Sequence, residues 1–71
     1  MKQYRITTVF ETLYTHETET KIEITNDFSA ALNCYIIRIE NPETTFCSID
    51  IMGENNSVKA IVAAFNANAL H

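Results

Sequence analysis

The first 25 residues alternate between apolar and polar side chains with a period of two, which is the pattern of β-strands rather than of helices. The segment 2–14 carries Tyr4, Ile6 and Phe10 at even positions, and the segment 18–25 carries Ile22 and Ile24 at even positions. The short polar stretch 15–17 separates the two runs, which favours a β-hairpin. This hairpin commits the chain to a sheet, and we expect the even positions of both strands to face the core.

Helical spacing follows the hairpin. Apolar residues recur from Phe28 to Ile39 at intervals of three and four, and Asp27 is a good N-cap for that helix. Pro42 predicts that the helix ends at or before Asn41. The β-forming residues at 35–39 leave a strand open as the alternative, but the helix is favoured because its apolar stripe holds for three turns.

Residues 44–52 alternate again and predict a third strand, which Gly53 closes. Beyond the polar loop 54–57, Val58, Ile61, Val62 and Phe65 have helical spacing and stand among several alanines. We therefore predict a second helix from Val58 onward, with a side chain of the polar loop as its N-cap.

The predicted fold is α+β, a single small domain over residues 1–71 with the order β-β-α-β-α. A right-handed crossover through the first helix makes the second and third strands parallel. The first strand lies between them, which gives a three-stranded mixed sheet of order 2-1-3 with both helices on one face. The expected core contains the apolar residues assigned to that face: Tyr4, Ile6, Phe10, Ile22, Ile24, Phe28, Leu32, Ile36, Ile49, Ile51, Ile61, Val62 and Phe65.

The small size and acidic charge narrow the classes of partner. A chain of 71 residues buries only about 60% of its unfolded surface, and two cysteines make no disulfide scaffold. A second copy or another stable partner is therefore expected. The net charge is -4 and the five basic residues are scattered, which disfavours direct binding to nucleic acid or to an anionic membrane.

The N-terminal residues predict the compartment. Lys2 and Arg5 are followed by no apolar stretch, so we expect no signal peptide, no membrane span and a cytoplasmic location. In that compartment both cysteines stay reduced.

No pattern of catalytic or metal-binding residues emerges from the sequence. His16 falls in a turn, His71 is the last residue, and Cys34 and Cys47 have no neighbouring base in the sequence. No Cys-x-x-Cys or closely spaced histidine pair is present. We therefore expect a protein that is not an enzyme and that has no cofactor, no metal site and no catalytic residue.

Two surfaces are candidates for binding a partner protein. If both helices cover one face, four apolar residues lie on the other, and a contiguous patch there would be an interface. Acidic residues gather near the hairpin, either as a solvated face or as a ridge for a basic partner. We expect a non-enzymatic protein-interaction module, a homodimer through the open sheet face or an edge. The alternative is an inhibitor, of the phage or mobile-element type, that blocks a nucleic-acid-handling complex through its acidic surface. The candidate partner-binding residues are Val9, Leu13, Phe46 and Met52 on the sheet face, with Glu11, Glu19 and Glu23 on the ridge.

Overall fold

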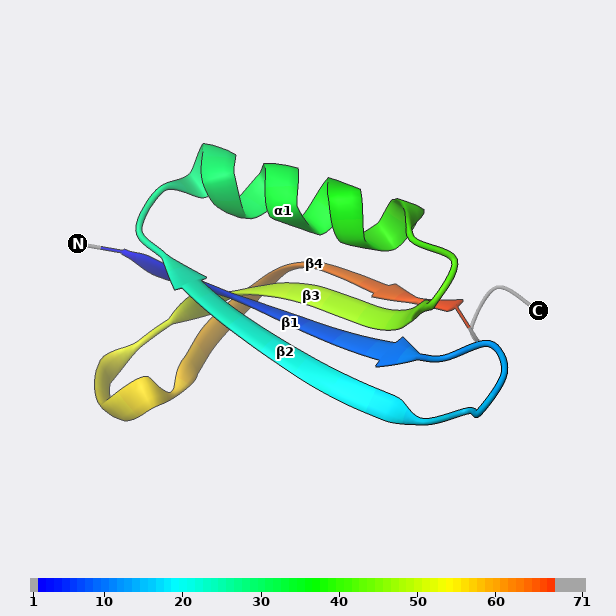
Figure 1. Cartoon of the computed structure of the whole chain (residues 1–71). Helices are drawn as coiled ribbons and strands as arrows, with labels where there is room; N and C mark the ends of the chain where they lie inside the picture. Colours follow the sequence, from blue (N-terminus) through cyan, green and yellow to red (C-terminus); the bar gives the residue numbers. More distant parts are fainter. Residues whose placement is uncertain (1, 68–71) are drawn as a thin grey trace.

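The computed structural model describes residues 2–67 as one four-stranded antiparallel sheet with a single helix along one face (Figure 1). The sheet has the order β2-β1-β3-β4, and each pair of neighbouring strands is antiparallel. The only elements apart from the strands in the described part are α1 and the short 3-10 turn η1. The bounds are β1 (Gln3–Glu11), β2 (Thr18–Thr25), α1 (Phe28–Glu40), β3 (Thr44–Met52), η1 (Glu54–Asn56) and β4 (Val58–Asn66).

The predicted three-stranded mixed sheet with two helices is wrong, although the α+β class is correct. The second predicted helix is strand β4. Asn55 and Asn56 adopt left-handed backbone angles, with φ of 58° and 60°, which asparagine tolerates better than most residues. The Gly53 N–H donates to the Ser57 carbonyl at 2.7 Å, so the chain reverses and returns beside β3. The polar loop therefore forms a hairpin turn and caps no helix.

Two β-bulges explain why β4 resembles a helix in sequence. The pairing with β3 shifts between Ile49 and Asp50 and again between Ile51 and Met52. At each shift β4 contains one extra residue, so its side chains no longer alternate with a period of two. Val58, Ile61 and Ala64 consequently line the same side of the sheet at intervals of three. This spacing imitates the i, i+3 pattern of a helix.

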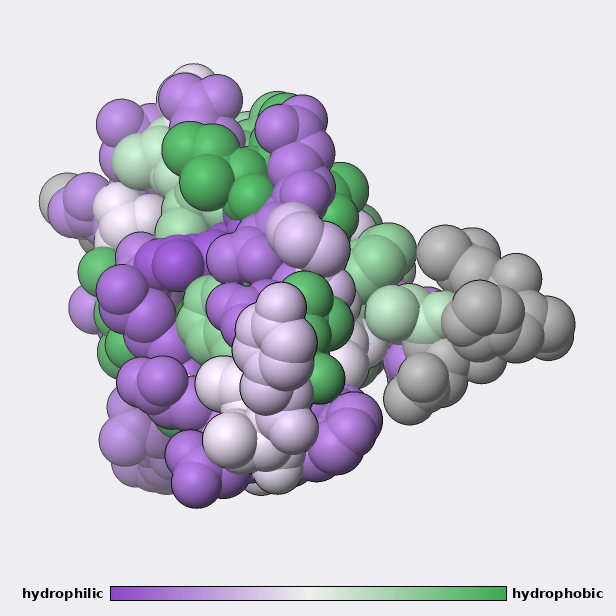
Figure 2. Space-filling model, turned by 45° about the vertical axis from the view of Figure 1, so that its right-hand side comes forward, coloured by the Kyte–Doolittle hydropathy of each residue, from purple (hydrophilic) through white to green (hydrophobic). Residues whose placement is uncertain are grey.

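Helix α1 forms where the sequence predicts it. The Asp27 carboxylate accepts hydrogen bonds from the backbone N–H groups of Ser29 and Ala30, which caps the first turn. The β-forming run 35–39 stays helical, and α1 ends at Glu40, before Pro42. Helix α1 packs on β3, β1 and β2. Its apolar stripe is only partly covered: in Figure 2 hydrophobic residues reach the surface of the upper, helix-bearing part of the molecule. The exposed large apolar residues of α1 are Phe28, Leu32, Ile36 and Ile37.

The register of the first hairpin differs from the prediction. Tyr4 pairs with Thr25 and Ile6 with Glu23, so even residues of β1 share a face with odd residues of β2. Because paired residues lie on one face, Ile22 and Ile24 point away from α1. Ile22 and Ile24 are therefore exposed. Five other predicted core residues, which lie on α1 and β4, are exposed as well: Phe28, Leu32, Ile36, Ile61 and Val62.

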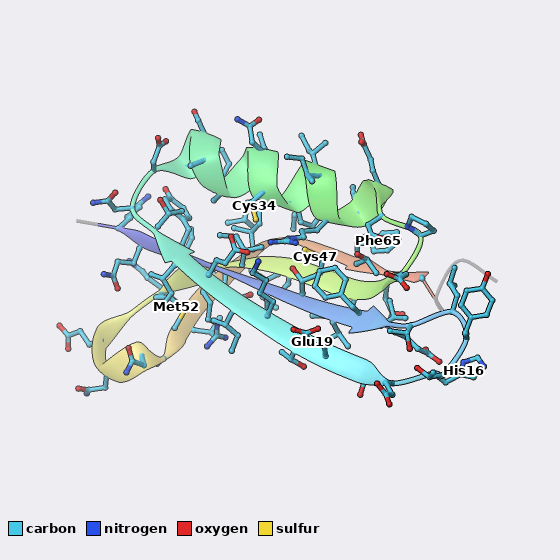
Figure 3. All side chains as sticks on the ribbon, in the orientation of Figure 1. His16, Glu19, Cys34, Cys47, Met52 and Phe65 are labelled. Atoms are coloured by element: carbon cyan, nitrogen blue, oxygen red, sulfur yellow. The ribbon has the colours of Figure 1, made fainter. Side chains whose placement is uncertain are left out.

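The hydrophobic core is small. Its fully buried members among the described residues are Ile6, Ala31, Cys47 and Ile49. Tyr4 and three residues of α1 pack against it, and the Tyr4 and Phe28 rings are 5.3 Å apart. Figure 3 shows Cys34 and Cys47 between the helix and the sheet. A core of this size leaves most of the large apolar side chains outside it.

Candidate protein interface on the open sheet face

The sheet face opposite α1 is built from residues that pair across all four strands, and we call it the open face. Its middle row is Ile24, Arg5, Asp50 and Ile61, taken in the order β2, β1, β3 and β4. The adjacent row is Ile22, Thr7, Ser48 and Ala64. Ile6 and Ile49, which pair with each other on the other face, contact the helix side of the core. In Figure 1 the open face carries no helix.

An ion pair stands at the centre of the open face. The Arg5 Nη2 donates to the Asp50 Oδ2 at 3.0 Å, and the two residues are direct partners in the β1–β3 pairing. The Asp50 side chain is 8% exposed and the Arg5 side chain 29% exposed. The Arg5 Nε is buried with no hydrogen-bond acceptor among the described residues. A charge pair therefore lies at the centre of the row, between Ile24 and Ile61.

Apolar side chains flank this ion pair across the sheet, and a shallow hollow beside it has a mixed lining. The hollow is lined by Arg5, Thr7, Ser48 and Asp50 together with Phe46, Val58, Ile61 and Ala64. The isoleucines at both ends of the middle row are more than half exposed, at 59% for Ile24 and 66% for Ile61. Single exposed apolar residues are common on proteins, whereas several large ones gathered on one sheet face favour an interface.

The structure brings three of the four predicted apolar contact residues to the open face. Val9 and Phe46 are direct partners in the β1–β3 pairing, and Met52 lies at the end of β3. Leu13 falls after the end of β1, in the turn before β2, and is 61% exposed. Figure 3 shows Met52 and the turn residue His16 at opposite ends of the sheet. Sequence reasoning missed Ile22, Ile24 and Ile61, because it assigned them to the core.

The three predicted acidic residues do not form one ridge. Glu11 pairs with Thr18 on the open face, and its carboxylate lies 2.9 Å from the His16 Nδ1. Glu19 and Glu23 pair with Phe10 and Ile6, which places them on the face that carries α1. An acidic surface made of all three side chains is therefore absent from this part of the fold.

Glu23 is engaged by α1. The Cys34 thiol donates to one carboxylate oxygen at 3.3 Å, and the Arg38 guanidinium donates to the other. The hydrogen bond from Cys34 and the positive charge of Arg38 lower the pKa of Glu23, against the opposing effect of burial. Burial and the neighbouring Glu23 raise the pKa of Cys34. Sequence reasoning did not foresee this cluster, because it placed Glu23 on the outer face.

The side chains that could bind a metal are spread over the described part of the chain. No group of three or more His, Cys, Asp or Glu side chains among residues 2–67 could hold a metal ion. Burial raises the pKa of the Cys47 thiol as well, so both thiols are poor nucleophiles at neutral pH. His71 lies outside the described residues. No helix in the described part of the chain is long and apolar enough to cross a membrane.

Comparison with protein family models, with curated proteins and with solved structures finds no significant match to this chain.

Proposed function

We propose that this chain is a non-enzymatic protein-interaction module that forms a homodimer through its open face. The observation that carries the proposal is the set of exposed apolar residues on that face, of which Ile22, Ile24 and Ile61 are each more than half exposed. These side chains flank a polar centre on two sides, and residues of all four strands contribute to the surface. Such a surface gains apolar burial when another sheet covers it.

The small core supports the same proposal. Four fully buried apolar residues contribute little stabilisation to a 71-residue chain, and domains of this size commonly obtain the remainder from a partner. Both described cysteines are free thiols, so no disulfide within residues 2–67 supplies it. The free thiols also favour the cytoplasmic location expected from the sequence.

The test is the molar mass in solution across a concentration series, measured by light scattering. The wild-type chain should approach twice 8.1 kDa as its concentration rises, and a constant mass of 8.1 kDa would overturn the proposal. Ile22→Glu places a charge on the open face and should keep the chain monomeric.

Ile37→Glu is the matched control for that variant. Ile37 is 67% exposed against 58% for Ile22, but it lies on α1 and outside the open face. The control variant should still dimerise. If both variants dimerise equally well, the interface lies elsewhere on the molecule. Circular dichroism of each variant verifies that the fold is intact.

A further inference from the structure

The central ion pair of the open face has a direction that determines how a second copy can cover it. Across the sheet the middle row has the order apolar, positive, negative, apolar, from Ile24 through Arg5 and Asp50 to Ile61. Two identical sheets that pack face to face are related by a two-fold axis lying between them. That axis can run along the strands or across them, because stacked sheets keep their strands roughly aligned.

The two axes have opposite electrostatic consequences. An axis across the strands at the level of the middle row places each Arg5 over the Arg5 of the second copy and each Asp50 over the other Asp50, which is repulsive. An axis along the strands reverses the row. Each Arg5 then lies over the second copy's Asp50, and each Ile24 lies over the second copy's Ile61. Only the second arrangement matches charge with opposite charge and apolar side chain with apolar side chain.

We propose that the Arg5–Asp50 pair fixes the geometry of the homodimer, with the two-fold axis along the strands and β1 of each copy over β3 of the other. This inference rests on the proposed homodimer and specifies its occupant and orientation. The partner that covers the open face is a second copy of this chain. When the second copy's row runs in the opposite direction, each charge lies over an opposite charge and each isoleucine over an isoleucine. The pair acts as a specificity-determining contact, and the surrounding isoleucines supply the apolar burial.

The geometry of the pair suits this role. The Arg5 side chain retains 29% exposure, although its Nε is buried without an acceptor among the described residues, whereas the Asp50 side chain is 8% exposed. Covering the face removes water from the four charges, which strengthens both attraction and repulsion between them.

The test exchanges the two charges within one chain. The variant Arg5→Asp/Asp50→Arg keeps the pair inside each copy and keeps the row complementary to its own reverse, so it should dimerise with itself. Mixed with the wild-type chain, it places Arg over Arg and Asp over Asp. Mixed dimers should therefore fall at least about tenfold below the statistical share, as measured by native mass spectrometry of chains that differ in isotope label.

The outcomes separate this inference from the proposed function. Wild-type chains of the two labels must mix statistically, which is the control. If the wild-type chain is monomeric, the proposed homodimer fails. If wild-type and exchanged chains both dimerise and also mix statistically, the homodimer stands and the role of the ion pair is refuted.

A second variant guards against misfolding of the exchanged chain. Arg5→Gln/Asp50→Asn has a similar shape and no charge at either position. Its homodimer should dissociate about tenfold more readily than the wild-type homodimer, because each cross contact loses its charge. An unchanged dissociation constant, with an intact fold by circular dichroism, would overturn the proposal as firmly as statistical mixing.

Discussion

Ile61→Ala should weaken dimerisation by a factor that the structure allows us to calculate. The change removes three carbon groups, which contribute about 2.4 kcal/mol when they are fully buried. Ile61 is 66% exposed in the single chain, so about 1.6 kcal/mol of that burial arises only when a second copy covers the open face. Two copies lose about 3.2 kcal/mol, which corresponds to a rise of roughly 200-fold in the dissociation constant.

The same calculation gives a smaller effect on the fold. The third of the side chain that is already covered accounts for about 0.8 kcal/mol of unfolding free energy per chain. β4 already contains three alanines, so one more is compatible with the strand. Sedimentation equilibrium measures the dissociation constant of the dimer. Urea unfolding of the monomeric variant Ile22→Glu, with and without Ile61→Ala, measures the change in unfolding free energy without a contribution from dimerisation.

Ile37→Ala is the control for this prediction. The chemical change is identical and Ile37 is 67% exposed, but it lies on α1 and outside the open face. Its dissociation constant should equal that of the wild-type chain. The reasoning is refuted if the two variants shift the dissociation constant equally, or if Ile61→Ala leaves it within about threefold of wild type.

Three further predictions concern the fold that supports the open face. Asp27→Ala removes the cap of α1 and should lower the unfolding free energy by about 1 kcal/mol in urea unfolding. Glu23 has a lowered pKa, so its stabilising contribution is present above the ordinary glutamate pKa and is lost as the pH falls through the folded-state value. Glu23→Gln should accordingly show a shallower loss of thermal stability on acidification than wild type. Alkylation at pH 7 should be slower for both thiols in the folded chain than in urea, and slowest for Cys47, which is fully buried. Mass spectrometry of timed samples measures the two rates, and equal rates in buffer and urea would contradict it.

The sequence predicts local elements well where one period dominates. The bounds of β2, β3 and α1 follow from their alternation, from the cap at Asp27 and from the proline after α1. β4 escapes prediction because its two bulges replace a period of two by a spacing of three, and alanine is a good helix former. The usable signal was the Asn55–Asn56 dipeptide, since consecutive asparagines tolerate the left-handed angles of a hairpin turn.

The face of a strand is harder to predict than the strand itself. The alternation of Ile22 and Ile24 shows that they share a face, but it does not show which residues of β1 lie opposite them. That choice depends on the residues between the strands. The Thr12 N–H donates to the Glu17 carbonyl, and His16 takes a left-handed φ of 57°. The turn pairs even positions with odd ones, and a shift by one residue would exchange the two faces of β2.

The observed register of β2 is not the one that would bury the most apolar surface within a single chain. A shift by one residue would turn Ile22 and Ile24 toward α1, where they would enlarge a core that holds few residues. It would also carry Glu23 away from Arg38 and Cys34, leaving both α1 side chains without their carboxylate partner. The ion pair between Glu23 and Arg38 and the turn between β1 and β2 hold the observed register, in which Ile22 and Ile24 remain exposed to water. Their exposure is a cost to the isolated chain, which a second copy on the open face would remove in the proposed homodimer. The position of Glu23 beneath α1 and the exposed isoleucines of the open face are thus two consequences of one register.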